Sequence, residues 1–331
     1  MTSPYDRRMS VPTQWLLESD PALRWQVERD LLGLDDAAWR ATRARVATEG
    51  FGARLLAHQD PDGRWARGAF FPGGQEWFAV QGEVPQPWTA TTWSLSSLRE
   101  WGLDPVVLLE RDTPGLLARH CRWEYDDLPY WEGEVDCCIN AFTLANGDWL
   151  GVDVGAILER LVGPAGGRMP DGGWNCSWVD GAQVSSFWST LNVVSGLLDH
   201  EQLVGGDARA REARRAGEEY LLARRLMYRL STGEVVGPWV RRFEYPYRGD
   251  YSVLRALDHF RRAAAHDGTA PDGRLADAVD VVRGARRDDG TWAREHRHAG
   301  DVWFEVDVPV GEPSPWLTLT GTLALRWWDA R

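Results

Sequence analysis

Hydrophobic and polar residues alternate along this chain with the period of an α-helix. Segments with one charged face are each followed by a turn or loop and then by a more apolar segment, and this period is typical of helices that bury one face. We expect the apolar helices to begin near Thr89, Cys137, Ser186, Asp250 and Trp316. No convincing alternation with a period of two residues predicts strands. The pattern therefore predicts an all-α protein.

The more polar segments predict the remaining helices. They cover residues 13–32, 37–47, 50–58, 105–125, 152–162, 207–230 and 275–286. Pro21 can split the first of these, because proline lacks the backbone N–H that a helix interior needs. The first apolar helix is expected to span residues 88–101, where Gly102 ends it.

A short turn that ends in tryptophan occurs three times. Its copies end at Trp65, Trp174 and Trp292, each with a glycine two residues earlier and an apolar helix soon after. A plan that recurs along a chain predicts a repeat architecture. Alternating buried and half-exposed helices close most simply into a double ring with the charged helices outside, and an open solenoid of stacked helix pairs is the alternative.

The first of these turns resembles the QW repeat of the squalene–hopene cyclase and protein-prenyltransferase superfamily. Residues 52–65 hold its glycine, leucine, Gln59 and Gly63-x-Trp65 positions, whereas the other two turns lack the glutamine. In such a repeat we expect Gln59 to cap a helix end and Trp65 to pack on the turn. The resemblance covers residues 50–330 and implies an (α/α) toroid of about five to six helical hairpins around a central cavity.

We accordingly expect a single domain, residues 1–331, with N-terminal helices at 1–48 and QW-type repeats at 49–331. The chain also resembles bacterial prenyltransferase/squalene-cyclase repeat proteins, which carry the sequences found here at Gly172–Cys176 and Ser185–Phe187. Membership of such a group implies a fold and does not establish a chemistry.

The most unusual feature of the composition is the number of tryptophans. The 331 residues include 20 Trp, against 8 Tyr and 9 Phe, and the flat indole face both covers apolar area and attracts cations.

The net charge of −12 would repel a phosphate backbone, so nucleic acid is not an expected partner. The four cysteines are expected to be free thiols. With no apolar run long enough to span a membrane and no secretory signal, the expected location is the cytoplasm.

Glu134 and Asp136 precede an apolar helix in a stretch that resembles the Asp-x-Asp-Asp motif of class II terpene cyclases. Asp136 matches the middle acid, Glu134 matches the first, and Cys137 replaces the last. The resemblance implies that Asp136 is a general acid that protonates an alkene or epoxide, aided by Glu134. The alternative is that Asp136 only caps the helix, since aspartate is a preferred N-cap.

The resemblance implies an enzyme that acts on an isoprenoid or similar apolar substrate through carbocation chemistry. Aromatic rings would shape the cavity and stabilise cationic intermediates. The candidates are Trp88, Trp93, Trp131, Trp174, Trp178, Phe187, Trp188 and Trp316. The first alternative is a non-catalytic toroid that holds a lipid or other apolar ligand, with many of the tryptophans serving repeat packing. The oligomeric state is left open.

A second alternative is a metal-dependent enzyme, although the cyclase hypothesis needs no cofactor. Residues 179–188 resemble the stretch that supplies Asp and Cys zinc ligands in prenyltransferase β subunits, with Asp180 in place and Ala182 where the cysteine would be. Residues 316–318 lack the third ligand, a histidine, so protein prenylation is not expected. A divalent metal held by Cys138, Cys176 and Asp180 is the alternative site.

Acidic residues gather shortly before the apolar helices or at their first residue. They are Glu83, Glu134, Asp136, Asp180, Glu244, Asp250, Asp307 and Glu312. They can be helix caps on a solvated rim or an acidic mouth that attracts a cation or a metal–diphosphate. The nearby arginines Arg241, Arg242 and Arg248 can pair with these acids or bind an anionic head group. His296 and His298 are expected at the surface of a loop.

Overall fold

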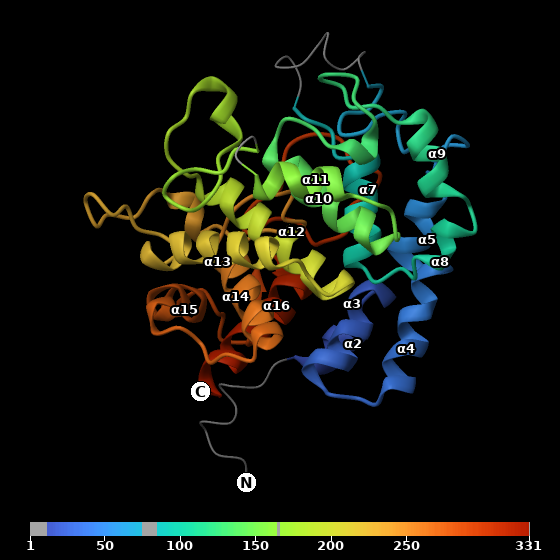
Figure 1. The fold of residues 1–331 in the computed structure, drawn as a ribbon. Coiled ribbons are helices and arrows are strands. Elements are labelled where there is room, and N and C mark those ends of the chain that lie inside the picture. Colours follow the sequence, from blue (N-terminus) through green and yellow to red (C-terminus); the bar gives the residue numbers. More distant parts are fainter. Residues whose placement is uncertain (1–11, 75–84, 164–165, 331) are drawn as a thin grey trace. The chain divides into compact units, whose positions relative to one another are not determined.

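The computed structural model describes residues 12–74, 85–163 and 166–330, which fold mainly into helices (Figure 1). The all-α class is therefore confirmed. In this part of the chain the only strands are β1 (Trp292–Ala293) and β2 (Pro313–Ser314), which pair antiparallel. The chain forms two compact units. Unit 1 comprises residues 1–51, 222–298 and 305–331, and unit 2 comprises residues 52–221 and 299–304. The closed toroid and the single domain stay predictions.

Unit 2 is built around α10 (Cys137–Trp149), which packs against α7 (Thr91–Glu100), α11 (Gly155–Val162) and α12 (Phe187–Val204) (Figure 1). Its other elements are α8 (Val106–Leu109), α9 (Thr113–His120), η3 (Tyr130–Glu132) and η4 (Cys176–Asp180). Helices α10 and α12 approach closely at Gly196, where a Cβ atom would lie 2.6 Å from the carbonyl oxygen of Ala141. Only glycine fits this contact, because real Cβ atoms do not come so near to backbone.

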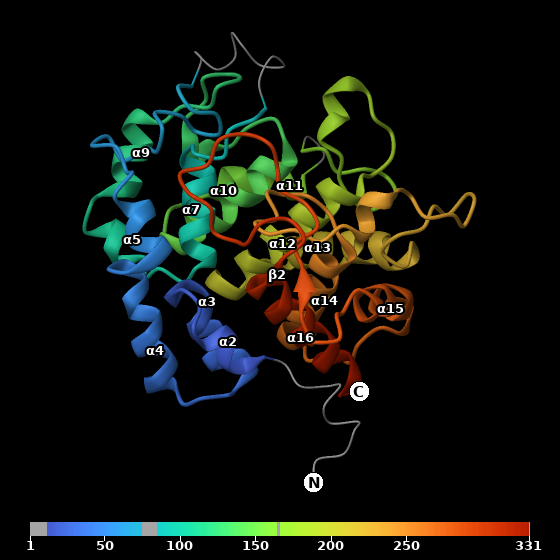
Figure 2. The same cartoon turned by 180° about the vertical axis from the view of Figure 1, so that it is seen from behind.

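Unit 1 is built around α14 (Val253–Asp267) and α16 (Pro315–Asp329), which pack against each other and against α15 (Ala276–Gly284) (Figure 2). Its other elements are α2 (Thr13–Leu17), α3 (Pro21–Gln26), η1 (Val27–Leu31), α4 (Asp36–Ala44), η2 (Arg45–Ala47), η5 (Pro238–Arg241) and η6 (Gly273–Leu275). The guanidinium of Arg326 donates to the carbonyl of Leu31 at 2.8 Å and ties α16 to η1. In the chain, α5 (Gly50–Leu56) and α13 (Ala208–Ala223) cross from one unit to the other.

The three tryptophan turns share one hydrogen-bonded geometry. In each, the backbone N–H five residues before the tryptophan donates to the carbonyl just before it, at 2.8, 2.8 and 2.9 Å, and the glycine between them has a positive φ. The indole N–H then donates to the last turn of the preceding helix, at Leu55, Leu161 and Val282. All three tryptophans are buried. The predicted repeat is therefore present as a local structure.

A threonine completes each turn from the following apolar helix. The backbone N–H groups of Trp65, Trp174 and Trp292 donate to the hydroxyls of Thr91, Thr190 and Thr318 at 3.0–3.1 Å. These threonines lie in α7, α12 and α16. Each turn thus joins the end of a polar helix to the first turns of an apolar one and satisfies backbone groups that would otherwise be buried without partners.

The role expected for Gln59 is wrong. Its side-chain amide donates to the carbonyl of Gly63 at 3.1 Å and to the hydroxyl of Thr113 at 2.9 Å. Gln59 therefore closes the turn and links it to the first residue of α9. The end of α5 is capped by the indole N–H of Trp65, which donates to Leu55.

Two of the predicted helices are shorter than expected. The helix expected at 105–125 is interrupted between α8 and α9, where Asp112 has a φ of 52°. The helix expected at 207–230 ends at Ala223, because Arg225 and Leu226 have φ angles of 47° and 63°. Such left-handed residues stop a right-handed helix and are rarely visible in a hydrophobic pattern.

Other helix boundaries follow from proline and from loop hydrogen bonds. Helices α2 and α3 are separate, as Pro21 allowed, and Asp20 caps α3 by accepting the N–H of Ala22 at 2.9 Å. Helix α7 begins three residues later than expected, and the N–H of Ser94 donates to the carbonyl of Ala90 at its start. No helix in the described part of the chain is long and apolar enough to cross a membrane.

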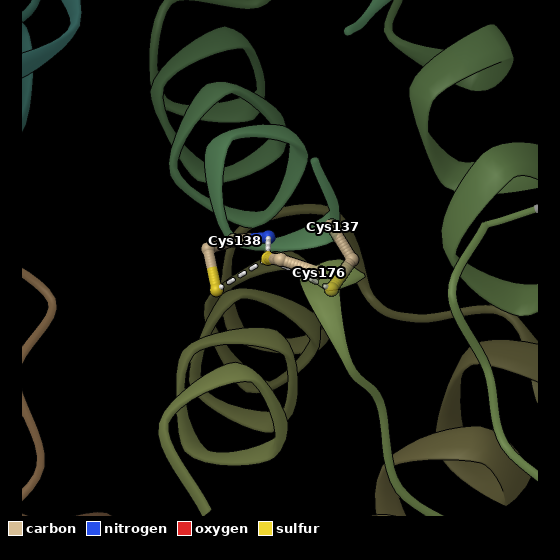
Figure 3. A group of neighbouring side chains, drawn as sticks. All are labelled: Cys137, Cys138 and Cys176. Atoms are coloured by element: carbon tan, nitrogen blue, oxygen red, sulfur yellow. Dashed lines mark hydrogen bonds between the residues drawn. The ribbon is translucent and has the colours of Figure 1, made fainter. Parts of the chain in front are cut away.

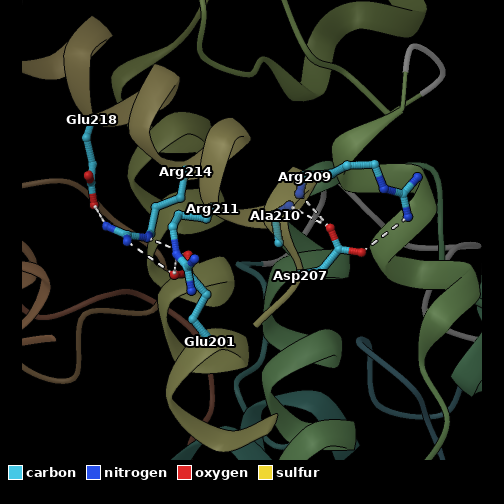
Figure 4. Close-up of polar contacts among 7 residues, drawn as sticks. All are labelled: Glu201, Asp207, Arg209, Ala210, Arg211, Arg214 and Glu218. Atoms are coloured by element: carbon cyan, nitrogen blue, oxygen red, sulfur yellow. Dashed lines mark hydrogen bonds and ion pairs between the residues drawn. The ribbon is translucent and has the colours of Figure 1, made fainter. Parts of the chain in front are cut away.

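A buried ion network joins α12 to α13 (Figure 4). Arg214 is fully buried and donates to Glu201 at 2.7 Å and to Glu218 at 2.8 Å. Arg211 also donates to Glu201, at 3.1 Å. On the same helix Arg209 forms a contrasting pair with Glu159, in which both side chains are more than half exposed.

Candidate metal centre

Three of the four cysteines meet at the starts of helices in unit 2 (Figure 3). Cys137 and Cys138 are the first two residues of α10, and Cys176 is the first residue of η4. The sulfur of Cys176 lies 3.1 Å from that of Cys138 and 3.4 Å from that of Cys137. All three sulfur atoms lie within 4.8 Å of one another. The sequence alternative named Cys138 and Cys176 and missed Cys137.

The tryptophan turn and two helix starts hold Cys176 in place. Its backbone N–H donates to the hydroxyl of Ser189 at 3.1 Å, in the first turn of α12. Just before it, Asn175 caps η4 by accepting the N–H of Ser177. The indole of Trp174 donates to Leu161 in α11. The residues before Cys176 and Ser177 after it are therefore held by hydrogen bonds. The complete set of three cysteines could have been found from the sequence. The signal is the adjacent Cys137–Cys138 pair together with a cysteine just after a repeat turn.

The three thiols do not titrate independently. Hydrogen bonds from Cys137 and Cys176 hold the pKa of Cys138 well below its ordinary value, and bonds from Asn192 and Ser189 add to this. The pKa of Cys137 is raised, because its thiol is held as a donor to Cys138. For Cys176 the bond with Cys137 lowers the pKa, but the bond with Cys138 and burial outweigh it and raise the pKa to about 12. Cys138 is therefore the sulfur that ionises first.

Two carboxyl groups stand beside the thiols. Asp136 occupies the N-cap position of α10, yet its side chain makes no capping hydrogen bond. Burial first, and then the hydrogen bond and charge of Cys176, raise the pKa of Asp136 to about 7. The carboxylate of Glu134 instead accepts the backbone N–H of Asp136 at 2.5 Å, and burial raises the pKa of Glu134 to about 7. The structure thus brings the predicted acid pair together next to sulfur.

Asp180 and Cys121 lie outside the cluster. Asp180, the last residue of η4, is exposed, and its charge raises the pKa of Asp136. Its carboxylate is not among the ligand atoms that meet at the three sulfurs. Cys121 is fully buried elsewhere in unit 2, and burial raises the pKa of its thiol. The donor set is therefore three sulfurs, and the carboxyl of Asp136, which is not among those ligand atoms either, hydrogen-bonds Cys176.

The predicted cavity aromatics have several structural roles. Trp88 packs edge-on against Trp93, which also contacts Phe70 and Phe142. Trp174 is the buried anchor of its turn, which is the packing role weighed as an alternative.

The remaining candidates pack near the helix starts or in the other unit. The indole of Trp131 donates to the carbonyl of Pro114, and that of Trp178 donates to Val135 just before α10. Phe187 is buried against Tyr220, and Trp188 is partly exposed. Trp316 belongs to unit 1, where it stacks on Tyr245 with ring centroids 4.2 Å apart. A surface pocket of about 600 Å³ in unit 1 is lined by none of the predicted aromatics and includes Glu312.

Other expected surface features need correction. Glu83 lies outside the described residues. Asp307 is not on a solvated rim: it accepts a hydrogen bond from the hydroxyl of Ser314, and burial raises its pKa to about 6. The expectation that the histidine pair lies at the surface is wrong for His298, whose side chain is only 11% exposed. Loop sequence did not reveal this burial, because it comes from segments distant in the chain.

Three thiolates suit a soft or borderline metal ion. Zinc binds sulfur at about 2.3 Å, which sets the sulfurs of a tetrahedral site about 3.8 Å apart. The observed separations of 3.1 and 3.4 Å are shorter than this by about 0.4–0.7 Å, so the sulfurs would have to move apart by that much to admit the ion. Comparisons of this chain with models of protein families, with curated proteins and with solved structures give no match.

Proposed function

We propose that this protein is zinc-dependent and binds the ion through Cys137, Cys138 and Cys176, with Asp136 as the fourth ligand. The observation that carries the proposal is the meeting of three sulfurs within 4.8 Å of one another. Cysteines distant in sequence have no need to converge if they only fill a core. Clustered thiolates are a common means of binding zinc.

The electrostatics of the cluster support a bound cation. The donors disfavour one another's ionisation: burial and the contact with Cys176 raise the pKa of Asp136, and the hydrogen bond with Cys138 and burial raise the pKa of Cys176. A divalent ion removes this penalty, since it favours the deprotonated form of every ligand. The start of α10 at Cys137 adds partial positive charge that favours thiolates.

The fourth position decides which chemistry zinc can supply. Three protein ligands with an exchangeable fourth are typical of catalytic zinc, whereas four fixed ligands are typical of structural zinc. Asp136 is partly exposed and makes no capping bond. Water or a substrate can therefore replace it, and zinc would then act as a Lewis acid. Glu134, which is bonded to the backbone of Asp136, would keep the carboxylate close to the ion.

The test is the metal content of gently purified protein and of matched variants. We expect one zinc per chain at this site, lost in Cys138→Ala and Cys176→Ala. Cys121→Ala is the control, because it removes a buried thiol outside the cluster, and it should keep the metal. A metal-free native protein that is two hydrogens lighter than its sequence mass would contradict the proposal. It would indicate a disulfide between Cys138 and Cys176 instead.

A second candidate is acid-initiated chemistry on an isoprenoid, as the cyclase resemblance implies. One observation favours it: burial raises the pKa values of Asp136 and Glu134 to about 7, so a protonated carboxyl is present near neutral pH. In this case Asp136 acts as a neutral acid, whereas in the zinc site it is an anion.

Asp136→Asn separates the two candidates. If zinc binding is the function, the variant binds the ion at least ~10-fold more weakly, because one charged ligand is lost. If acid catalysis is the function, the variant keeps its metal content and loses turnover of polyprenyl substrates assayed by product extraction. Unchanged metal affinity together with unchanged turnover would rule out both roles for Asp136.

A further inference from the structure

Two loop segments of unit 1 run side by side and bring four ligand-type residues together. Phe243 and Glu295 pair through two hydrogen bonds of 2.8 Å, from the N–H of Glu295 to the carbonyl of Phe243 and from the N–H of Phe243 to the carboxylate of Glu295. Glu244 and His296 are the next residues of the two segments, and Asp250 and His298 follow them. Residues about fifty positions apart in sequence are thereby placed next to one another.

The distances among these side chains match those of metal ligands. Nε2 of His298 lies 3.5 Å from Oε2 of Glu244, and Nε2 of His296 lies 3.8 Å from the same oxygen. A metal with nitrogen and oxygen ligands at about 2.1 Å sets the ligand atoms of a tetrahedral site about 3.4 Å apart. The three atoms therefore need little movement to share one ion.

Glu244 is the second, independent observation. Glu244 is only 4% exposed. Its Oε2 atom is buried and accepts no hydrogen bond from any residue that the structure describes. Leaving a buried carboxylate oxygen unsatisfied is costly. The carboxyl group of Glu244 also pairs with Asp250, whereas the imidazole nitrogens lie 3.5 and 3.8 Å from Oε2, too far to be good donors to it. A cation between the three atoms would satisfy the oxygen.

The surroundings of His298 are those of a metal ligand. Its ring hydrogen-bonds the backbone of Tyr247, and Nδ1 lies 3.7 Å from the carboxylate of Asp250. Metal-bound histidines commonly donate their second nitrogen to such a partner.

We propose that Glu244, His296 and His298 form a second metal site, in unit 1, for a borderline divalent transition-metal ion. The backbone of Tyr247 holds the ring of His298, and the carboxylate of Asp250 lies next to it. Two histidines and one carboxylate leave coordination positions open. His296 is 36% exposed, so water or a small ligand can reach these positions from solvent. This site shares no residue with the three thiols and takes nitrogen and oxygen ligands instead of sulfur.

The test is cobalt(II) titration of the full-length protein after chelation, followed by visible absorption. A site with nitrogen and oxygen ligands gives d–d bands without the sulfur-to-cobalt charge transfer that marks the thiol cluster. We expect these bands in the wild-type protein. In Glu244→Gln and His298→Gln the affinity for cobalt should fall at least ~100-fold, because loss of a residue that only supports a metal ligand lowers metal affinity about 10–100-fold. Asp250→Asn should fall in that 10–100-fold range.

His120→Gln is the control, because His120 is exposed on α9, and it should bind as wild type does. His296→Gln changes a half-exposed side chain and keeps the test decisive if a buried substitution unfolds unit 1, as judged by circular dichroism. Wild-type affinity in both Glu244→Gln and His296→Gln would overturn the proposal. So would a wild-type cobalt spectrum in which every band depends on Cys176.

Discussion

At the scale of single residues, the tryptophan turns depend on a threonine that no sequence motif contains. The backbone N–H of each turn tryptophan is buried and has a threonine hydroxyl as its acceptor. Glycine and tryptophan two residues apart were visible in the sequence. The threonine was not, because it follows the tryptophan by 26 residues in two turns and by 16 in the other. Only the folded helix places it there.

Thr318→Val should therefore destabilise unit 1. Valine has the same shape but cannot accept the N–H of Trp292, and an unsatisfied buried donor costs about 1–3 kcal/mol. Thr322→Val is the matched control, one turn later in α16. The Thr322 hydroxyl is buried without a hydrogen-bond partner among the described residues, so its loss should leave stability equal or higher. Urea unfolding of both variants measures this, and equal losses would contradict the role of Thr318.

At the scale of secondary-structure elements, α12 and α13 are held together by charges that are buried. The helices of this pair are long and their apolar faces were predicted, but the network of Arg214 with Glu201 and Glu218 was not. A charged residue on an amphipathic helix is normally assigned to the solvent face. Arg214 has no exposed surface, which the hydrophobic pattern of one helix alone does not indicate.

Arg214→Met should lower the free energy of unfolding by about 3–5 kcal/mol, because it leaves buried carboxylates without their partner. Arg209→Met on the same helix removes an exposed pair and should be close to wild type. Both are measured by urea unfolding at pH 7. A loss as large in Arg209→Met would show that burial is not the deciding factor.

The same network predicts a pH dependence. Burial raises the pKa of Glu201, but Arg214 and Arg211 outweigh it and hold the pKa below its ordinary value. A carboxyl with a lowered folded-state pKa contributes stability above its unfolded pKa of about 4.3, and that contribution disappears as the pH falls through the folded value. The difference between wild type and Arg214→Met should therefore shrink below about pH 4. A constant difference down to pH 3 would exclude Glu201 as its source.

At the scale of the whole molecule, local pattern predicted helices and could not predict which of them share a unit. Unit 1 joins the first 51 residues to segments that begin at residues 222 and 305, and helical periodicity has no information about such pairings. The candidate sites show the same limit. Asp136, Cys138 and Cys176 were named from sequence, whereas Glu244 and His298 became neighbours only through the pairing of Phe243 with Glu295.

The conserved geometry of the three turns also has a consequence for how such repeats are recognised in other chains. Between the copies, most side chains differ, and the glutamine occurs in one alone. Three features are the same in all copies. The glycine has a positive φ, and the indole N–H donates to a carbonyl about ten residues or more earlier, at a helix end. A threonine hydroxyl in the next helix accepts the backbone N–H of the tryptophan. A search that scores these three physical requirements would detect copies too diverged for any letter-by-letter motif, and would recover duplication events that sequence identity has erased.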